Sequence, residues 1–508
     1  MRKFALCLCA MFSLLILFTK TSYAAELRRP ISPEQPMWLI HLDTWNYPDP
    51  ERIIELIPDD ILPYCVFNIS LSASDNVCIS GPNVCDSWLK ACAAKNVWCT
   101  VQCASGGHSR FSDFDLTYYE RYFNEYPNFI GWNFAEQFWG FGEEDTPTFP
   151  ERLALFGEIL KICNRYGGYL IVSFTQAEYS ADMMPIAYMK RNAIVNEQLT
   201  NHPENFICCE KYTMKRGFFE IESNCLGAYL GGYAGQYGIR FDQCGWATSD
   251  EDAEPFVTAS GAIPIMEHVM LTGETVIDGP ELIWQQDTKE TNRISTTDGY
   301  SRRNWDFFSQ FVNINIDEFR KILDGTVRIL SREEVIDRTK ICVINDLNNG
   351  NFDDYTSPAS MFHGLYRQDY DGTVNNPIAT NIWWMKKTGR YPTFPQVYGL
   401  LDETAQKLIG VKKSEYSKRW PTVDAKVAEF NKLFPQEYTG DIYAAHAENT
   451  WMTYNPYQYE HANGTVHTSS KRAKGNIPFL YNTSESISFD YAPYSMAVMK
   501  EFSDSILL

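Results

Sequence analysis

Short apolar runs alternate with amphipathic stretches through the first half of the chain, and this alternation limits the fold more than any other feature. Eight of these runs predict strands, within residues 38–43, 61–70, 97–103, 128–132, 168–175, 206–212, 226–241 and 274–283. Helical patterns separate most of them, at 49–56, 86–95, 116–125, 150–166, 181–199 and 254–270. The strand runs are nearly continuously apolar, which is typical of parallel strands buried on both faces. The sequence therefore predicts an α/β protein built as a (β/α)8 TIM barrel, whose active site lies at the carboxyl ends of the strands.

The pattern changes toward the C-terminus. Two more helices are expected at 302–323 and 332–338, with a strand at 339–345. After Leu433, short alternating runs predict a β-sandwich, with strands at 441–445, 450–454, 477–481 and 486–491. We therefore divide the chain into a barrel over 25–400, a helical connection over 401–423 and a sandwich-like domain over 424–508. The sequence ends within or just after a strand, at Ile506-Leu-Leu508, which leaves the completeness of this domain open.

The first 24 residues have the pattern of a secretory signal peptide. Arg2 and Lys3 precede an apolar stretch over 4–18, and Ser22-Tyr23-Ala24 forms a small-x-small cleavage site. The apolar stretch is short for a membrane span, and no later stretch predicts one. We expect a protein that is exported to the periplasm or the medium and that has no membrane partner.

The chain carries a net charge of -20 at pH 7. A surface this acidic repels nucleic acids and anionic membranes, so neither is expected as a partner. The charge is compatible with a neutral substrate.

The sequence predicts no cofactor and no metal. The cysteines after the leader form no pair with zinc spacing, although an oxidising compartment would permit disulfides. Asp346, Asp353 and Asp354 could bind calcium, but their spacing departs from the usual calcium loop and favours a polar turn. The glycine-rich stretch 231–235 lacks the pattern of a dinucleotide-binding turn.

The stretch Ile130-Gly-Trp-Asn-Phe-Ala-Glu-Gln-Phe-Trp-Gly-Phe-Gly142 places an acid, Glu136, just after the fourth predicted strand and before Phe138, Trp139 and Phe141. Aromatic faces stack on sugar rings and exclude water, and loss of water favours the protonated form of a carboxyl group. Such an acid can give a proton to a departing glycosidic oxygen. The alternative is a glutamate in a surface loop beside core aromatics.

Four strings of the sequence together resemble glycoside hydrolase family 98. They are Trp38-Leu-Ile-His-Leu-Asp-Thr-Trp-Asn46, Asn133-Phe-Ala-Glu-Gln-Phe-Trp-Gly140, Thr275-Val-Ile-Asp-Gly-Pro-Glu281 and Glu448-Asn-Thr-Trp-Met-Thr-Tyr-Asn-Pro456. The resemblance covers roughly residue 36 to the end. It implies a (β/α)8 barrel with a β-sandwich, and endo-acting hydrolysis of a β-1,4 linkage with inversion at the anomeric carbon.

By this resemblance Glu136 looks like the general acid, and Asp242 with Glu281 looks like the acidic pair that activates water. Glu267 and Glu274 compete with Glu281, which we prefer because it lies at the end of the eighth predicted strand. Asp242 and Glu281 could instead be structural partners of Arg240 or Lys211. A retaining mechanism with Asp242 as nucleophile also stays open. The two mechanisms differ in carboxyl separation, roughly 6.5–9.5 Å for inversion and about 5–5.5 Å for retention.

The resemblance implies an oligosaccharide or polysaccharide substrate. The family's substrates are blood-group A and B glycans, cut at a galactosidic bond, and plant xylan, and we prefer the former. A glycan-binding protein without activity is the rival class. Further candidate sugar contacts lie at predicted strand ends or in the loops after them: His41, Trp45, Asn68, His108, Asn133, Trp139, Glu210, Tyr212 and Trp284. For His41 and His108 a purely structural role is an equal alternative.

Overall fold

A computed structural model describes most of the 508-residue chain. The residues it describes are 24–43, 50–71, 81–109, 115–137, 146–174, 185–212, 218–241, 266–278, 293–295, 301–303, 315–346, 365, 367–368, 385–386, 395–399, 401–456, 459–462, 465–468, 471–493 and 495–508.

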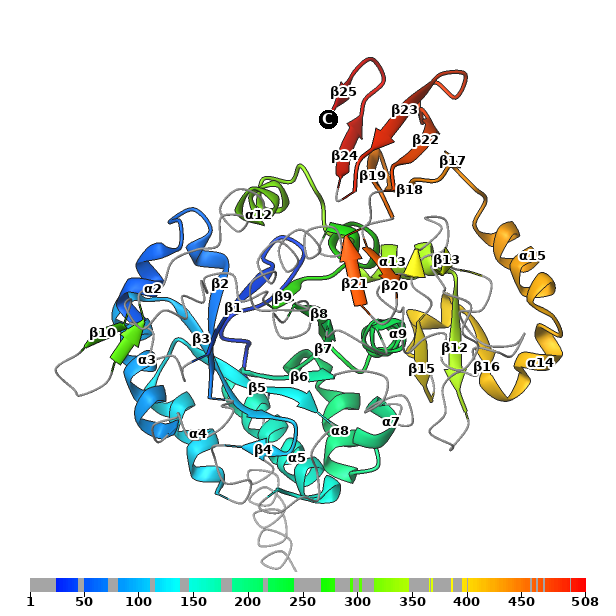
Figure 1. Ribbon diagram of the computed structural model, residues 1–508. Coiled ribbons are helices and arrows are strands. Elements are labelled where there is room, and N and C mark those ends of the chain that lie inside the picture. The colour runs from blue at the N-terminus through cyan, green and yellow to red at the C-terminus, as the bar shows by residue number, and fades with distance from the viewer. Residues whose placement is uncertain are drawn as a thin grey trace, which may run out of the picture.

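Eight parallel strands form a closed barrel (Figure 1). In spatial order they are β2 (Cys65–Ser70), β1 (Met37–Asp43), β9 (Val276–Asp278), β8 (Gln236–Phe241), β7 (Phe206–Tyr212), β6 (Tyr169–Phe174), β5 (Phe129–Gln137) and β3 (Trp98–Ser105). The pairing of β2 with β3 closes the ring. A two-residue strand, β4 (His108–Ser109), runs antiparallel to the end of β3. The predicted (β/α)8 barrel is confirmed.

Helices lie between the barrel strands and cover the ring from outside (Figure 1). They are α2 (Pro50–Leu56), α3 (Gly81–Lys95), α4 (Leu116–Glu125), α5 (Phe149–Tyr166), α7 (Pro185–Met189), α8 (Ala193–Asn201) and α9 (Phe218–Leu230). The start of α5 is well defined by sequence, because Thr148 and Glu151 form a capping box around its first turn. That start matters for the site, since α5 directly follows the loop after β5.

The barrel has two apolar layers. The inner layer fills the ring at the amino ends of the strands, and its buried members are Ile31, Met37, Leu39, Val66, Ile130, Tyr169, Ile171, Ile207, Cys209 and Val276. The outer layer lies between strands and helices and includes Trp38, Trp88 and Trp132. Nearly continuous burial on both faces explains why the strands are apolar runs rather than alternating ones.

Two arginines near the start of the described chain brace the amino-terminal side of the barrel. Arg29 is almost fully buried and donates hydrogen bonds to the carbonyl oxygens of Pro36 (2.8 Å) and Tyr64 (3.0 Å). Arg28 donates to the carbonyl of Phe123 at 2.6 Å. These carbonyls lie just before β1 and β2 and in the last turn of α4, so both arginines satisfy backbone acceptors around this end of the barrel.

Two predicted elements differ from the structure. The sequence predicts a helix over 302–323, but Ser301–Arg303 form β11, which pairs with β10 (Arg293–Ser295), and the described helix α12 covers Ile316–Leu323. Pairing across a hairpin outweighs local helical preference here. No helix is predicted just ahead of the seventh strand. In the structure, α9 ends at Leu230, inside the range 226–241 in which that strand is predicted. The helix packs against β7, β8 and β15, and its described side chains at 223–230 are all buried, so this half lacks the exposed polar stripe by which a surface helix is recognised.

A small parallel sheet stands beside the barrel. Its order is β15 (Gln396–Tyr398), β12 (Ile341–Asn345) and β16 (Ile409–Lys412). Helix α13 (Arg332–Thr339) precedes it, and α14 (Tyr416–Arg419) and α15 (Val423–Leu433) follow it. The hairpin β13 (Arg367–Gln368) with β14 (Met385–Lys386) belongs to the same stretch of chain. The predicted boundary at residue 400 and the connection over 401–423 stay a prediction.

The last part of the chain forms antiparallel sheets, at the top of Figure 1. One contains β17 (Thr439–Gly440), β22 (Ala473–Pro478) and β23 (Ser486–Tyr491). The other contains β18 (Tyr443–Ala447), β19 (Thr450–Tyr454), β24 (Met496–Glu501) and β25 (Ile506–Leu507). A hairpin, β20 (Tyr459–Ala462) with β21 (Thr465–Thr468), lies between them in sequence. The predicted all-β C-terminal region is confirmed.

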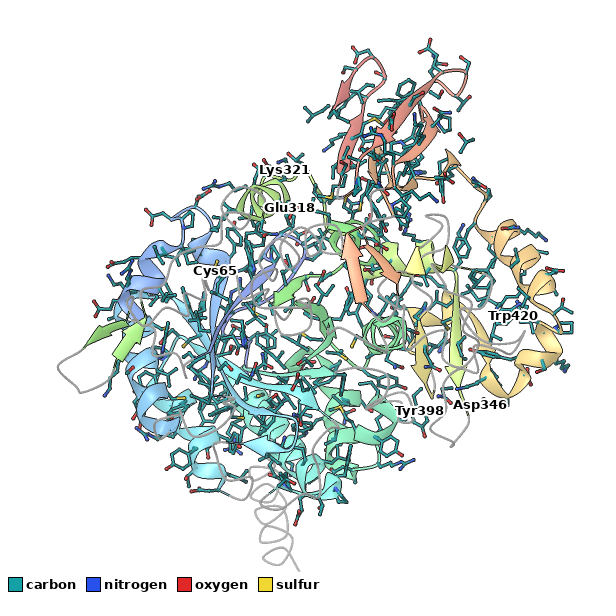
Figure 2. All side chains as sticks on the ribbon, in the orientation of Figure 1. Cys65, Glu318, Lys321, Asp346, Tyr398 and Trp420 are labelled. Carbon is teal, nitrogen blue, oxygen red and sulfur yellow. The ribbon has the colours of Figure 1, made fainter. Side chains whose placement is uncertain are left out.

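The C-terminal region and the barrel share one core. Tyr443 and Tyr454 belong to the same buried cluster as the outer barrel layer. Helix α12 also caps this cluster, with Phe319 against Trp38 at 4.3 Å between ring centroids. Figure 2 labels Glu318 on this helix, beside Lys321. The barrel and the C-terminal region therefore share a continuous hydrophobic core and are not separate domains joined by a linker.

The ten cysteines that the structure describes are all buried and carry no disulfide. Among the described residues, no helix has both the length and the apolar character needed to cross a bilayer.

Candidate active site

Glu136 lies inside the carboxyl end of β5, one residue before the strand ends, and not in a surface loop. Its backbone has a φ of 52°, in the left-handed region that residues other than glycine rarely adopt. The pairing of β5 with β6 breaks between Phe134 and Gln137, so Glu136 leaves the ladder at this point. A bulge of this kind redirects a side chain at the rim of a barrel.

The carboxylate of Glu136 is held by the neighbouring strand. The Oγ of Ser105, the last residue of β3, donates a hydrogen bond of 2.6 Å to its Oε2. The side chain is half-buried. A carboxyl oxygen fixed in this way at a barrel mouth is compatible with the predicted role of a proton donor.

The interior of the barrel turns polar toward the same end. Asn68 on β2 is its centre, because its amide contacts three other strand residues. Its Nδ2 lies 3.2 Å from Nδ1 of His41 and 3.4 Å from Oε1 of Gln102, and its Oδ1 accepts from Thr100 Oγ1 at 3.1 Å. An amide nitrogen can only donate, so Nδ1 of His41 accepts and the ring proton sits on Nε2. Gln102 in turn donates to Ser70 Oγ at 3.1 Å.

Asn133 continues this polar layer on β5. It pairs in register with Gln102 on one side and Ile171 on the other, and it is fully buried. Among the described residues, neither of its amide atoms has a hydrogen-bond partner, and the same holds for the buried Oγ of Ser173 on β6. Buried polar atoms without partners are costly, and such atoms near the predicted acid Glu136 are compatible with a site for a polar ligand.

The remaining predicted site residues are less fully described. Asp242, Glu281, Trp45, Trp139 and Trp284 lie outside the described residues. The backbone of His108 lies in β4, and that of Glu210 and Tyr212 lies in the carboxyl half of β7. The structure therefore brings together Glu136, Asn133, Asn68 and His41, and their companions stay predictions.

Two acids that compete with Glu281 are held in structural contacts. Glu267 accepts hydrogen bonds from the hydroxyls of Tyr443 (3.4 Å) and Tyr454 (3.2 Å). Glu274 is fully buried and accepts from the backbone N–H of Ile239 on β8. These contacts give both acids a role in packing, and the choice of Glu281 for the chemistry stays a prediction.

Sequence reasoning missed Ser105, Ser70, Thr100 and Gln102. Their signal was present, because Thr100 and Gln102 are polar at alternate positions of a strand that is otherwise apolar. Alternate positions point into the barrel together, so paired polar residues near a strand's end mark the inner surface of the site.

The described residues contain no candidate metal-binding site. Among the described residues, no group of His, Cys, Asp or Glu side chains is arranged to hold an ion. Asp346, from the predicted polar turn, accepts from the backbone N–H of Ser414 at 2.9 Å and contacts its hydroxyl.

Two family models account for most of the chain. The model for glycosyl hydrolase family 98 matches residues 25–328, and the model for the family's C-terminal domain matches residues 332–508. The chain belongs to glycosyl hydrolase family 98. It is thereby placed among the glycoside hydrolases, and the predicted resemblance is confirmed.

A curated relative of this family 98 protein is the blood-group-substance endo-1,4-beta-galactosidase of Clostridium perfringens. The two are 24% identical over 476 residues, which are 86% of this chain and 55% of the relative. This chain therefore spans about half the length of the curated relative it matches.

Solved structures agree on the fold. The catalytic module of a family 98 glycoside hydrolase from Streptococcus pneumoniae TIGR4, in complex with the H-disaccharide blood group antigen, matches with a TM-score of 0.70 at 19% identity over 95% of this chain and 82% of that chain. The same module in complex with the LewisY pentasaccharide matches with a TM-score of 0.69 at 18% identity over 95% and 82%. The barrel and the C-terminal β region thus occur together in this family.

Proposed function

We propose that this protein is an endo-acting hydrolase that cleaves an internal β-1,4-galactosidic bond in blood-group A- and B-type glycans, with inversion at the anomeric carbon. The observation that carries the proposal is the geometry of Glu136. A glutamate at the carboxyl end of a barrel strand, in a left-handed backbone conformation and bonded to Ser105 at 2.6 Å, is a group held in place for chemistry.

In this mechanism Glu136 protonates the departing glycosidic oxygen. Asp242 and Glu281 follow β8 and β9, which lie on the other side of the ring from β5. One of them removes a proton from water as the other orients that water. Inversion requires a gap of roughly 6.5–9.5 Å between acid and base so that water fits between base and sugar. A donor in this role typically contributes about 10²- to 10⁴-fold to the rate.

The substrate class follows from the relatives. The curated relative is named for blood-group substance, and two of the matching structures hold blood-group oligosaccharides. None of these comparisons favours xylan. The unpaired amide of Asn133 and hydroxyl of Ser173 support a polar, hydroxyl-rich ligand. Export, which the leader predicts, would bring the enzyme to such glycans.

The test compares product release from type 2 A and B glycans, from H and LewisY glycans, and from decorated arabinoxylan. Release of the A or B trisaccharide in the α-anomeric form, followed by proton NMR before mutarotation, is the expected result. Initial release of the β-anomer would show retention, and xylo-oligosaccharides would overturn the galactosidase assignment. Binding of A or B glycans without any release would favour the binding-protein class.

The residue assignment is tested with Glu136→Gln. We expect loss of turnover by about 10²- to 10⁴-fold with glycan binding retained. Glu158→Gln is the matched control, because Glu158 is a partly exposed acid on the next helix that pairs with Lys161 at 2.9 Å. Full turnover by the Glu136 variant would refute its role as the acid.

A further inference from the structure

Arg152 is a buried cation directly behind the candidate acid. Its side chain is almost fully buried in the first turn of α5. Its Nη1 donates to Oε1 of Gln137 (2.8 Å) and to the carbonyl of Gly106 (3.1 Å), and its Nη2 donates to the carbonyl of Gly107 (3.3 Å). The guanidinium also lies 5.2 Å from the ring centroid of Phe134.

This placement carries two costs for stability. Burial removes the hydration of a charged group, even though backbone and amide oxygens accept hydrogen bonds from it. The first turn of a helix also carries the positive end of its dipole, which repels a cation. A position with two such costs is explained if the arginine does something that a smaller apolar residue could not.

Gln137 links the arginine to the backbone around Glu136. Its Nε2 donates to the carbonyl of Ala135 (2.7 Å) and to that of Gly106 (3.0 Å). The backbone N–H of Gly106 donates to the same carbonyl of Ala135 at 2.9 Å. The residues on both sides of Glu136 are therefore hydrogen-bonded to the turn between β3 and β4. Arg152 donates hydrogen bonds to the two glycines of the same turn.

Resting on the proposed function of Glu136, we propose that Arg152 and Gln137 are positioning residues that fix the left-handed backbone of Glu136 and aim its carboxyl at the leaving oxygen. A φ of 52° at a glutamate is stable only where its surroundings over-determine it. Ser105 completes the alignment, since it belongs to the same β3 end and bonds the carboxylate itself. None of these three residues needs to touch the substrate.

The proposal predicts a dependence on the leaving group. Protonation matters for a sugar leaving group, which is a poor one, and matters little for a dinitrophenolate, which departs unprotonated. Misplacing the acid should slow natural glycans far more than a 2,4-dinitrophenyl β-glycoside of the A trisaccharide. A merely structural defect would slow both substrates equally.

The variants are Arg152→Lys, which keeps the charge but cannot reach all three oxygens, and Gln137→Met, which keeps the shape. Arg29→Lys is the matched control, because Arg29 is equally buried and bonds backbone carbonyls at the opposite end of the barrel. For Arg152→Lys we expect kcat on the A glycan to fall about 10- to 100-fold, with KM within about twofold. The dinitrophenyl substrate should lose less than about threefold, and the alkaline limb of the pH–rate profile should move. Arg29→Lys should lower the melting temperature without changing this ratio.

The outcomes separate the two proposals. If Glu136→Gln shows the leaving-group dependence and neither Arg152→Lys nor Gln137→Met does, the positioning proposal is wrong and the acid assignment holds. If Glu136→Gln shows no such dependence, the proposed function fails. In that case a crystal structure of Arg152→Lys still tests the positioning: an unchanged φ at Glu136 and an unchanged bond to Ser105 would overturn it.

Discussion

Tyr443 and Tyr454, on neighbouring strands of the C-terminal sheet, stack with ring centroids 4.4 Å apart and an interplanar angle of 19°. Their hydroxyls converge on the two carboxylate oxygens of Glu267, 3.4 Å and 3.2 Å away. Glu267 belongs to the helical segment just ahead of β9 and is buried. The C-terminal region thus supplies the hydrogen bonds for an acid inside the barrel domain.

Removing a hydroxyl from this pair should destabilise the protein. Burial and the charge of Glu267 raise the pKa of Tyr454 well above its usual value, so the hydroxyl stays protonated and can donate. Tyr454→Phe removes a hydrogen bond to a buried carboxylate, and we expect a cost of about 1–3 kcal/mol in the free energy of unfolding. Urea denaturation measures it.

Tyr491→Phe is the control for that variant. Tyr491 bonds the hydroxyl of Thr453 within the C-terminal region and does not contact the barrel acid. It should cost less than Tyr454→Phe, because the partner it leaves is neutral. Equal costs would mean that Glu267 is not the reason for the tyrosine pair.

Glu318 should make stability depend on pH. Burial raises the pKa of this carboxyl to about 8, even though Asn315 donates to it at 3.4 Å. The folded protein therefore keeps a proton that the unfolded chain releases above about pH 4.5. Stability must fall as pH rises from about 4.5 to about 8, by up to about 5 kcal/mol, and stay level above that.

The variant Glu318→Gln tests this dependence. It keeps the shape and removes the ionisation, so it should raise the melting temperature at pH 8 much more than at pH 5. Glu333→Gln, an exposed acid on α13, is the control and should leave the pH dependence as it is. A parallel fall of stability in Glu318→Gln and in the unchanged protein would rule out Glu318 as the cause.

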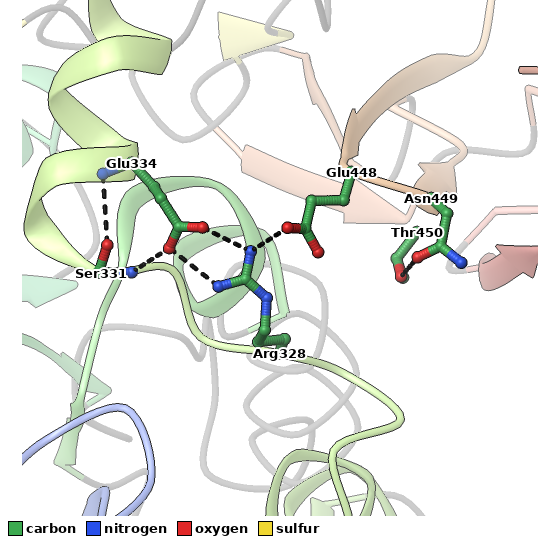
Figure 3. Close-up of polar contacts among 6 residues, drawn as sticks. All are labelled: Arg328, Ser331, Glu334, Glu448, Asn449 and Thr450. Carbon is green, nitrogen blue, oxygen red and sulfur yellow. Dashed lines mark hydrogen bonds and ion pairs between the residues drawn. The ribbon is translucent and has the colours of Figure 1, made fainter.

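Arg328 joins the start of α13 to the C-terminal region (Figure 3). It forms a two-point contact with Glu334 (2.9 Å and 2.8 Å) and a third contact with Glu448 at 3.1 Å. Arg328, followed by the capping contacts of Ser331, lowers the pKa of Glu334 to about 2. Because this pKa is depressed, the contribution of Glu334 is present above about pH 4.5 and is lost as pH falls toward 2.

Glu334→Gln should cost about 0.5–1 kcal/mol at pH 7, since the group is partly exposed and solvent screens the pair. The difference from the unchanged protein should shrink as pH falls toward 2, and it should also shrink in 0.5 M salt. Glu448→Gln should cost less than about 0.5 kcal/mol, because its single contact is more exposed. Equal losses at both positions, measured by thermal unfolding, would contradict the capping role.

The sequence predicts the elements whose signals are local. The strand at 206–212 and the helix at 116–125 have the predicted bounds, because an apolar run or a 3.6-residue period is complete within the element itself. The position of Glu136 at the end of a barrel strand was also predictable, since an apolar run that ends in polar residues is a local pattern.

What the sequence could not predict depends on residues far apart in the chain. Ser105 and Glu136 are 31 residues apart, and Tyr443 and Glu267 are 176 apart. The sequence around one residue of such a pair does not indicate which distant residue it contacts. The left-handed backbone of Glu136 is also unpredicted, because glutamate has no local preference for that conformation.

Gly131 offers a last test of how β5 is placed. Its φ is 153°, and a Cβ built on it would lie 2.1 Å from the carbonyl oxygen of Tyr169 on β6. The pairing of β3 with β5 shifts here, from Cys99 opposite Phe129 to Thr100 opposite Gly131. Gly131→Ala must push the two strands apart five residues before Glu136.

We expect Gly131→Ala to cost about 3 kcal/mol or more in stability and to reduce turnover as well, because it displaces the strand that carries the acid. Gly325→Ala is the matched control, since its φ of 77° is also positive but a Cβ there meets nothing within 4 Å. That variant should cost only about 1–2 kcal/mol for the backbone conformation and leave turnover unchanged. Comparing urea unfolding and kcat of the two variants separates the steric clash with Tyr169 from the strain of a positive φ. Equal effects in both variants would mean that β5 and β6 can separate without cost.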